Sequence, residues 1–304
     1  EDDEVAKKLF KEISKIYSDN VYIVAIDDGS VRYPLQVGHI ESANLSGVVI
    51  KLKKNVGHQR SIAIGLSYVA ENMNNESRIV VMDSDGEDTP ESIKELLALL
   101  MSNDNDVIVA ERKSRVETAW FRFFYIIYKW LFKLLSGRKI NFGNFMALNS
   151  YAVKRLVSMH ELGIHVASSV LMSRLRITSC SLDRGKRYAG KGKINFVGQV
   201  LHGFRALMVF SEDVLVRVGM VCALVAFLSI LGGISAVILK VFGFATPGWF
   251  SVALGILMLV FLQTGALTLI ILMLTGVIKS DSSTSIRYKD FIDIVQHSKY
   301  KTKS

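Results

Sequence analysis

Two aspartates spaced one residue apart, Asp83 and Asp85, follow a short apolar run and precede Glu87 in the segment VVMDSDGEDTPE at 80–91. If the apolar run is a strand, these carboxylates lie at its carboxyl end, where open α/β folds bind ligands. Carboxylate oxygens suit Mg²⁺ or Mn²⁺, which can bridge a protein to a diphosphate. The segment therefore predicts a metal and diphosphate site; the alternative is a solvated loop that caps a helix near Ser92.

A second pair of carboxylates, Asp27 and Asp28, stands in the segment DDGS at 27–30, directly after the apolar residues 21–26. A carboxylate at the end of a buried strand can accept hydrogen bonds from the N–H groups of a base or from ribose hydroxyls. Asp and Gly also favour tight turns, so a structural turn is the alternative interpretation.

Apolar periodicity predicts the elements that must position these carboxylates. Strands are expected at 21–26, 48–52, 79–82 and 106–110, and helices at 5–16, 61–71 and 93–101. Strands that alternate with helices indicate an α/β domain with a parallel, doubly wound sheet. We expect this domain to occupy residues 1–194.

Two later segments combine aromatic or apolar residues with basic ones. Residues 119–135 contain Arg122, Lys129 and Lys133 among aromatic residues. This composition suits a helix that lies in the membrane interface, although a core helix fits the periodicity equally well. Residues 195–213 are predicted to form a second interfacial amphipathic helix.

Two uncharged apolar runs, at 218–239 and 249–278, are each long enough to cross a membrane. The short segment between them contains glycine and proline, which favour a tight turn. Residues 214–279 are therefore expected to form a hairpin of two transmembrane helices; a buried core hairpin is the alternative.

Basic residues are distributed unequally around these runs. Arg205 and Arg217 precede the first run and Lys279 follows the second, whereas the intervening loop carries only Lys240. The positive-inside rule therefore predicts a multi-pass protein of the cytoplasmic membrane, with the α/β domain and a tail at 280–304 in the cytoplasm.

The composition agrees with a membrane protein. The chain has 304 residues, of which 50% are hydrophobic, and its formal net charge is +9. Such a charge suits either nucleic acid or an anionic membrane surface. Because no nucleic-acid motif is present and the apolar residues concentrate after residue 213, we do not expect nucleic acid as a partner. Cys180 and Cys222 show neither disulfide nor metal-site spacing.

The order of several motifs resembles glycosyltransferase family 2. They are DDGS at 27–30, N-x-G at 55–57, DSDGEDTPE at 83–91, ERKSR at 111–115, GNF at 143–145 and DRGKRYAGKGK at 183–193. With a hairpin after the domain, the chain is most similar to the polyprenyl-phosphate glycosyltransferases, which include dolichyl-phosphate mannose synthase and bactoprenol glucosyltransferases. The resemblance implies a GT-A (Rossmann-like) fold, a nucleotide-diphosphate sugar donor, Mg²⁺ or Mn²⁺, and a polyprenyl phosphate acceptor.

The resemblance also implies roles for individual residues. It assigns the donor nucleotide to Asp27, Asp28, Asn55, Gly57 and Asp83, the metal to Asp83, Asp85 and Glu87, phosphates to Arg112, Arg184, Arg187 and Lys193, and catalysis to Asp85, Asn144 and Arg184. Arginine suits bidentate contacts with phosphate. Simple contact with lipid headgroups is the alternative for the basic residues at 184–193.

The chain departs from the family pattern in three places. The Pro-x-Tyr-Asn-type motif of the family's first strand is absent from this sequence, Asn144 stands where many relatives carry aspartate, and GKGK at 190–193 replaces Gly-Glu-Ser-Lys. Asparagine cannot act as a base. A lipid phosphate needs no strong base, however, because it already carries a charge of about −1.5 to −2 near pH 7.

These features together predict a metal-dependent membrane hexosyltransferase. It would transfer a sugar, with inversion, from a nucleotide sugar to undecaprenyl or dolichyl phosphate at the cytoplasmic face, giving a lipid-linked sugar for cell-envelope or glycan modification. A catalytically weakened scaffold of the same fold and a processive polysaccharide synthase are the alternatives. The Gln-x-x-Arg-Trp-type motif of such synthases is absent. A homo-oligomer is compatible with the sequence.

Overall fold

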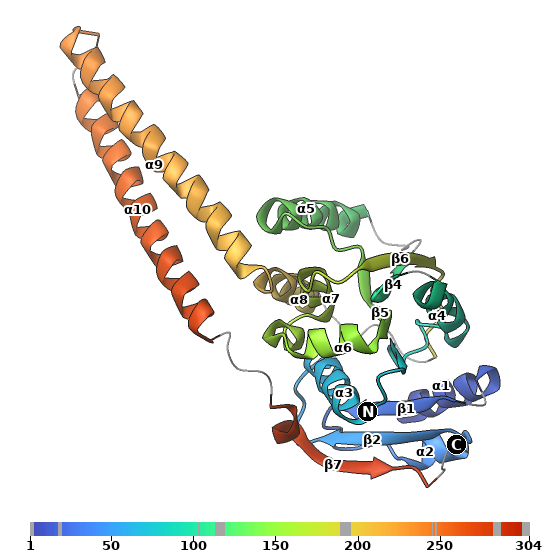
Figure 1. Cartoon of the computed structure of the whole chain (residues 1–304). Helices are drawn as coiled ribbons and strands as arrows, with labels where there is room; N and C mark the ends of the chain where they lie inside the picture. Colours follow the sequence, from blue (N-terminus) through green and yellow to red (C-terminus); the bar gives the residue numbers. More distant parts are fainter. Residues whose placement is uncertain are drawn as a thin grey trace. The chain divides into compact units, whose positions relative to one another are not determined.

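The computed structural model describes residues 3–17, 20–102, 104–112, 119–188, 196–244, 246, 248–281 and 287–299 (Figure 1). The chain divides into two compact units. An α/β unit comprises Glu1–Ile126, Lys139–Val209 and Ser285–Ser304, and a helical unit comprises Ile127–Arg138 and Phe210–Thr284. The α/β unit thus includes residues from both sides of the long apolar helices.

One sheet of the α/β unit has the strand order β1-β2-β7. Strands β1 (Tyr22–Asp27) and β2 (Ser46–Leu52) are parallel, whereas β7 (Ile292–His297) runs antiparallel to β2. The central strand β2 is buried along nearly its whole length. Strand β7 lies in the segment that the sequence predicts to be a tail, and this strand is not anticipated by the sequence pattern.

The second sheet has the order β3-β5-β4-β6. It consists of β3 (Arg78–Val81), β4 (Val107–Arg112), β5 (Phe142–Asn149) and β6 (Ile177–Leu182). Strand β5 is antiparallel to both β3 and β4, and β6 is parallel to β4. The carboxyl ends of β3, β4 and β6 therefore share one edge with the amino end of β5.

The predicted all-parallel sheet is wrong, because both sheets are mixed. The α/β class itself is confirmed, and four of the strands lie where apolar periodicity placed them. Strands β5 and β7 run antiparallel to their neighbours, which are distant in the sequence. The prediction failed here because the alternation of strands and helices does not reveal strand direction.

Helices cover the two sheets. They are α1 (Asp3–Ile16), α2 (Gly38–Ser42), α3 (His58–Asn72), α4 (Ile93–Ser102), α6 (Ser150–Val157), α7 (Val166–Met172) and α8 (Phe196–Met208), with short 3-10 turns at η1 (Pro90–Ser92), η2 (His160–Gly163) and η3 (Tyr288–Phe291). In the main core cluster, Leu66 of α3 and Leu156 of α6 pack with Met146 and Leu148 of β5. Burial of each such side chain contributes about 1.5–3 kcal/mol.

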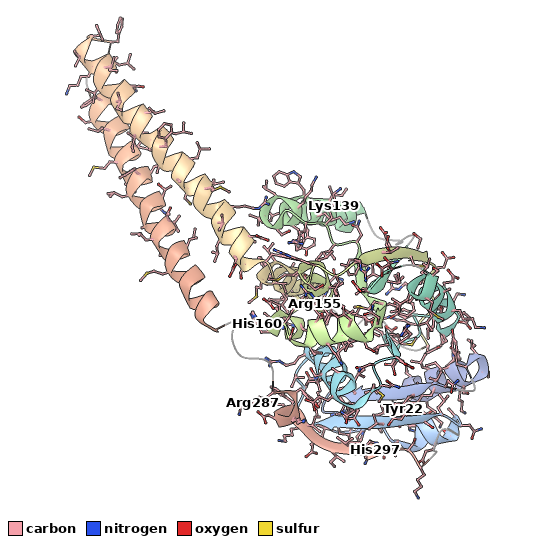
Figure 2. All side chains as sticks on the ribbon, in the orientation of Figure 1. Tyr22, Lys139, Arg155, His160, Arg287 and His297 are labelled. Carbon is pink, nitrogen blue, oxygen red and sulfur yellow. The ribbon has the colours of Figure 1, made fainter. Side chains whose placement is uncertain are left out.

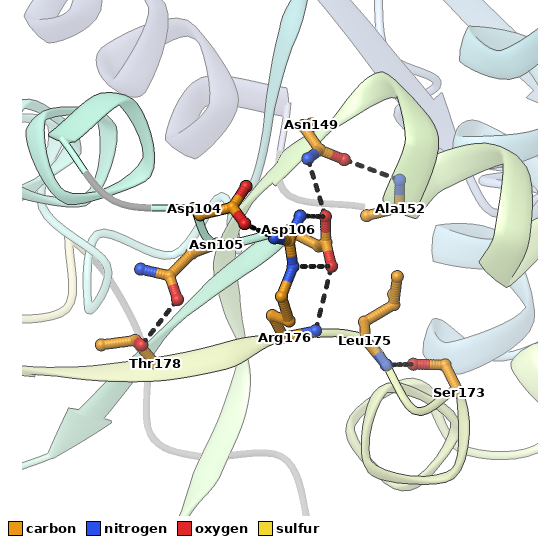
Figure 3. A network of polar contacts seen from close by, with 9 residues as sticks. All are labelled: Asp104, Asn105, Asp106, Asn149, Ala152, Ser173, Leu175, Arg176 and Thr178. Atoms are coloured by element: carbon orange, nitrogen blue, oxygen red, sulfur yellow. Dashed lines mark hydrogen bonds and ion pairs between the residues drawn. The ribbon is translucent and has the colours of Figure 1, made fainter.

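A polar network fixes the edge of the second sheet opposite to the acidic segments (Figure 3). The buried Asp106 carboxylate, just before β4, accepts from the Arg176 guanidinium at 3.0 and 3.1 Å and from Asn149 Nδ2 at 3.2 Å. Asn149 in turn accepts from the Ala152 N–H at 2.7 Å and so caps α6. The network joins the amino ends of β4 and β6 to the carboxyl end of β5.

The helical unit contains the second half of α5 (Ala119–Ser136) and a hairpin of α9 (Ser211–Val241) and α10 (Trp249–Asp281). The hairpin helices approach closely, since a Cβ on Gly232 would lie 3.2 Å from Leu257. Two segments, Ser211–Val241 and Trp249–Ile271, are long and apolar enough to cross a membrane. Their side chains project from the hairpin along its length (Figure 2). The two predicted apolar helices are confirmed.

Within the helical unit, α5 packs against the start of α9. The Phe132 ring meets the Phe210 ring edge-on, with centroids 5.9 Å apart, and Arg217 donates to the Leu134 carbonyl at 3.1 Å. Trp130 and Leu134, four residues apart, remain exposed on α5. The second half of α5 is therefore joined to the hairpin and still presents an apolar face.

Candidate active site

His58, the first residue of α3, brings three of the predicted segments together. Its Nε2 lies 3.3 Å from Asp83 Oδ1 and 3.0 Å from Asn144 Nδ2. The hydrogen bond to Asp83 raises the pKa of His58 above its ordinary value against the opposing effect of burial, and the charges of Asp83, Asp28 and Asp85 act in the same direction as this bond. The carboxylates that follow β1 and β3 therefore all raise the pKa of one histidine.

The hydrogen bonds of His58 constrain Asn144. Nε2 cannot accept from the Asn144 amide while it donates to the Asp83 carboxylate. Because the carboxylate only accepts, Nε2 carries the proton and the Asn144 amide turns its oxygen towards His58; the amide orientation is assigned from this network. From sequence, a metal-binding role for His58 has no partner His at ligand spacing, so His58 is interpreted as a donor to phosphate or a loop contact. Its contacts with Asp83 and Asn144 are not visible in the sequence, because both residues are distant along the chain.

Asp27 and Asp28 both hold backbone segments. Asp27 is 5% exposed, and its two oxygens accept from the Ser30 and Leu35 N–H groups at 2.9 Å. Asp28 accepts from the N–H groups of Val56 at 2.7 Å and Gly57 at 3.0 Å. Asp27 therefore holds the DDGS turn and Asp28 ties this turn to the N-x-G segment, while the nucleotide contacts predicted for both stay predictions.

The N-x-G segment belongs to the loop that joins β2 to α3, at residues 53–57. A Cβ on Gly29 would lie 2.5 Å from the Lys54 carbonyl carbon, so the DDGS turn touches the backbone of this loop. Gly57 has φ +89°, a left-handed conformation that glycine adopts without strain. Asn55 and Gly57 are thus held at the carboxyl end of β2, beside Asp28.

Arg184 and Arg187 pair with the acidic segment at 83–87. Arg187 Nη2 lies 3.0 Å from Asp85 Oδ2, and its Nε donates to Glu87 Oε1 at 2.7 Å. Arg184 pairs with the other oxygen of Glu87. Burial, and then the charge of Arg187, lowers the pKa of Arg184. Two of the predicted phosphate-binding arginines are therefore adjacent to the predicted metal-binding carboxylates.

Backbone hydrogen bonds also connect the basic segment at 184–188 to the acidic segment at 83–87. Gly185 N–H donates to the Glu87 carbonyl and Tyr188 N–H to the Asp85 carbonyl, both at 2.9 Å. A Cβ on Gly185 would lie 2.3 Å from the Gly86 oxygen, so only glycine permits this approach. The basic residues at 184–187 consequently contact the acidic segment at 83–87, although about 100 residues separate the two segments in the sequence.

The carboxylates fit a metal that is shared with a substrate. Asp83 and Asp85 offer hard oxygen ligands, and Mg²⁺ is commonly held by one or two carboxylates together with substrate phosphates. Within the described residues, no group of three or more His, Cys, Asp or Glu side chains could hold an ion by itself. Both oxygens of Glu87 contact arginines, and those of Asp85 contact the Glu87 N–H at 3.0 Å and Arg187, so the metal-binding role of these residues stays a prediction.

Two of the remaining predicted residues are described only in part or not at all. Arg112 ends β4 with its backbone beside Leu182, which immediately precedes the basic segment at 183–188. The Arg112 side chain and the whole of Lys193 lie outside the described part of the chain. The roles of both residues therefore stay predictions.

The chain belongs to glycosyl transferase family 2, whose family model matches residues 3–157. One relative is the uncharacterized glycosyltransferase YkoT of Bacillus subtilis (strain 168), 26% identical over 262 residues, or 84% of this chain and 73% of the relative. Another is the uncharacterized glycosyltransferase YkcC of the same strain, 25% identical over 189 residues, or 60% and 56% of the two chains. The predicted family is confirmed, and membership implies a nucleotide-sugar donor and an acceptor.

Among solved structures, the chain is similar to one described as "Crystal Structure of a Mycobacterial Protein". The similarity has a TM-score of 0.42 at 14% sequence identity and covers 71% of this chain and 70% of that chain.

Proposed function

We propose that this glycosyltransferase moves a sugar, with inversion, from a nucleotide-diphosphate donor to a polyprenyl phosphate such as undecaprenyl or dolichyl phosphate, at the cytoplasmic face of a membrane. One observation carries the proposal. Arg184 and Arg187 are fastened against Asp85 and Glu87 in a chain that also carries two long apolar helices. A site of this kind can accept two phosphate groups, and the apolar helices would keep the chain at a membrane that holds a lipid acceptor.

The acceptor phosphate is the nucleophile in this proposal. One of its oxygens forms a bond to C1 of the sugar while the bond between C1 and the donor phosphate breaks, and the nucleoside diphosphate leaves with the electron pair. Because the phosphate is already charged, no side chain has to remove a proton. A single displacement of this type inverts the configuration at C1.

Positioning and charge compensation are then the main tasks of the protein. Arg184 and Arg187 would hold the two anionic substrates side by side, which otherwise repel one another. When bound through Asp83 and Asp85, Mg²⁺ or Mn²⁺ supplies positive charge for the leaving diphosphate. Asn144, linked to Asp83 through His58, would orient the acceptor by a hydrogen bond.

An exposed apolar face on α8 supports contact with lipid. Val197, Leu201, Phe204 and Met208 lie on one side of the helix at helical spacing and are all exposed, whereas Ala206 on the other side is buried. Such a face suits a helix that lies in the membrane interface. The apolar face of α5 supports the same role.

A test is to identify the lipid product directly. Membranes containing the full chain would be offered polyprenyl phosphate with a panel of nucleotide sugars, and the lipids analysed by mass spectrometry. We expect one hexose to be added to the polyprenyl phosphate, and Arg184→Met to reduce the product about a hundredfold or more. A sugar recovered on another acceptor, with no polyprenyl-phosphate sugar, would refute the proposed acceptor.

A weakened scaffold is the second candidate, because Asn144 stands where the family pattern described above has an aspartate, and asparagine cannot act as a base. A scaffold would bind nucleotide but form product no faster than a chain with Asp83→Ala and Asp85→Ala. Progress curves over many turnovers therefore separate the two candidates.

A further inference from the structure

The segment after the helical hairpin, residues 287–299, reaches the loop at 53–57. Beyond the pairing of β7 with β2, the Lys53 N–H donates to the Phe291 carbonyl at 3.0 Å, and Lys53 Nζ donates to the Asp290 carbonyl at 3.0 Å. The turn η3 thereby holds the first residue of the loop. Figure 2 labels Arg287, the residue before η3, and His297, the last residue of β7.

The same turn also holds α3, the helix that follows the loop. Tyr288 is 6% exposed, packs with Ile64 and Tyr68 of α3, and donates its hydroxyl to Glu71 Oε2 at 2.6 Å. Phe291 lies under the Arg60 guanidinium, 5.2 Å from the ring centroid. The first residue of the loop and the helix that follows the loop are therefore both held by η3.

On the side away from η3, the loop at 53–57 contacts the residues that carry the predicted acidic site. There the Asp28 carboxylate holds the N–H groups of Val56 and Gly57, and the loop leads directly into His58, which contacts Asp83. The loop is consequently held between η3 on one side and the DDGS turn on the other. A shift of η3 would change the position of Asn55 and Gly57 relative to Asp28.

We propose that Tyr288 and Phe291 are positioning residues that keep the loop at 53–57 in the conformation that binds the donor nucleotide. The inference rests on the proposed function only in taking that loop as part of the donor site.

The test compares Phe291→Ala with Ile294→Ala in the full chain. Ile294 lies on β7, three residues after Phe291, and is 46% exposed, so its truncation removes an apolar side chain of the adjoining element that is partly in solvent. Two quantities would be measured in detergent: hydrogen exchange of the amides at 54–57, and the Kd of the tightest binder among UDP, GDP, ADP and CDP with Mn²⁺.

We expect Phe291→Ala to raise exchange of the Val56 and Gly57 amides about tenfold, since partial loss of support increases local opening. It should weaken nucleotide binding about tenfold and raise the donor KM with little change in kcat. Phe291→Tyr keeps the ring and should restore both quantities, and Ile294→Ala should leave both unchanged. If Phe291→Ala fails to fold, Lys53→Met removes only the contact with the Asp290 carbonyl and should give the same changes in smaller size.

Unchanged exchange at 54–57 in a folded Phe291→Ala chain would overturn the inference. Raised exchange of the amides at 54–57 with an unchanged nucleotide Kd would show that this loop does not determine donor binding and would overturn that part of the inference. Neither result depends on the acceptor. If the wild type forms no lipid-linked sugar while Phe291→Ala still alters exchange and Kd, the proposed acceptor fails and the positioning role stands.

Discussion

Asp83 and Asp85 are the residues on which charge compensation depends. Asp83→Ala and Asp85→Ala should each lower kcat about a hundredfold or more, because the diphosphate then leaves without a bound divalent cation. Initial transfer rates would be measured together with Mn²⁺ binding by electron paramagnetic resonance. Glu95→Ala, which removes an exposed carboxylate on α4, should affect neither quantity. Full activity of the double variant, or of the wild type in excess chelator, would refute the metal site.

Asn144 tests whether the acceptor phosphate is its own nucleophile. Asn144→Asp places a carboxylate beside His58, which already contacts Asp83. Attraction by the His58 ring and repulsion by the substrate phosphates would oppose one another, so we expect a rate within about tenfold of wild type. Asn144→Ala should cost more, because the orienting hydrogen bond is lost. Initial rates would be measured across pH; a gain of several decades in Asn144→Asp would reveal a missing general base, and an unchanged rate in Asn144→Ala would remove Asn144 from the site.

His165 should make stability sensitive to acid. It is 4% exposed, and its Nδ1 accepts from the Ser168 N–H at 3.1 Å. Burial, followed by the charge of His202, lowers its pKa from 6.5 to about 3. Between these two values the unfolded chain binds more protons than the folded one, so the free energy of unfolding falls as pH falls through this window and is fully present above its upper limit.

The expected size of this effect is about 3 kcal/mol between pH 7 and pH 4. His165→Asn keeps an acceptor at the start of α7 but removes the titration, so its stability should depend much less on pH. Urea unfolding of the α/β unit, followed by near-UV circular dichroism, measures this. The wild type measured in parallel gives the reference slope, and an equal slope in His165→Asn would contradict the assignment.

Secondary structure was predictable where each element carries its own apolar pattern. The expected strand at 48–52 is β2, and the expected helix at 93–101 is α4. Strand β6, ITSCSL, has exposed polar residues on one face, and β5 contains Gly143 and Asn144. These two strands are stabilised by pairing with β4, which is a long-range interaction that the local pattern does not report.

The site was predictable in its motifs but not in its pairings. The acidic segment at 83–87 and the basic segment at 184–187 were both recognisable from residue type. That Arg187 bridges Asp85 and Glu87 depends on the backbone hydrogen bonds of Gly185 and Tyr188. The contact of His58 with Asp83 depends on the position at which α3 begins. Such contacts depend on how the helices and strands pack together. The local pattern of a single sequence does not report that packing.

Asp106 is expected to stabilise the junction of β4, β5 and β6. Asp106→Ala removes the acceptor for Asn149 and for the Arg176 guanidinium. We expect a loss of about 3 kcal/mol in the free energy of unfolding, reduced by the partial exposure of Arg176. Urea unfolding measures it. Asp104→Asn changes an ion pair at a side chain that is 91% exposed and should remain close to wild type; equal losses in the two variants would contradict the special role of Asp106.

At the scale of the whole molecule, the α/β unit is built from residues on both sides of the hairpin. Strand β7 pairs with β2, so the chain returns to the same folded unit after α10. If α9 and α10 both cross a membrane, the crossings must therefore be even in number and both outer ends must lie on one side. This physical requirement agrees with the distribution of basic residues, in which Lys240 is the only charge between the two runs.

The topology can be tested by accessibility labelling of single cysteines in a chain with Cys180→Ala and Cys222→Ala. Thr246→Cys lies between the helices and Lys299→Cys follows β7. In sealed inverted vesicles, an impermeant maleimide should label Lys299→Cys, because the α/β unit faces outward there, and should label Thr246→Cys only after detergent is added. Equal labelling of both positions in sealed vesicles would place the turn and the α/β unit on one side. In that case the hairpin does not cross the membrane, and its apolar side chains must instead be covered by lipid along one leaflet or by another protein.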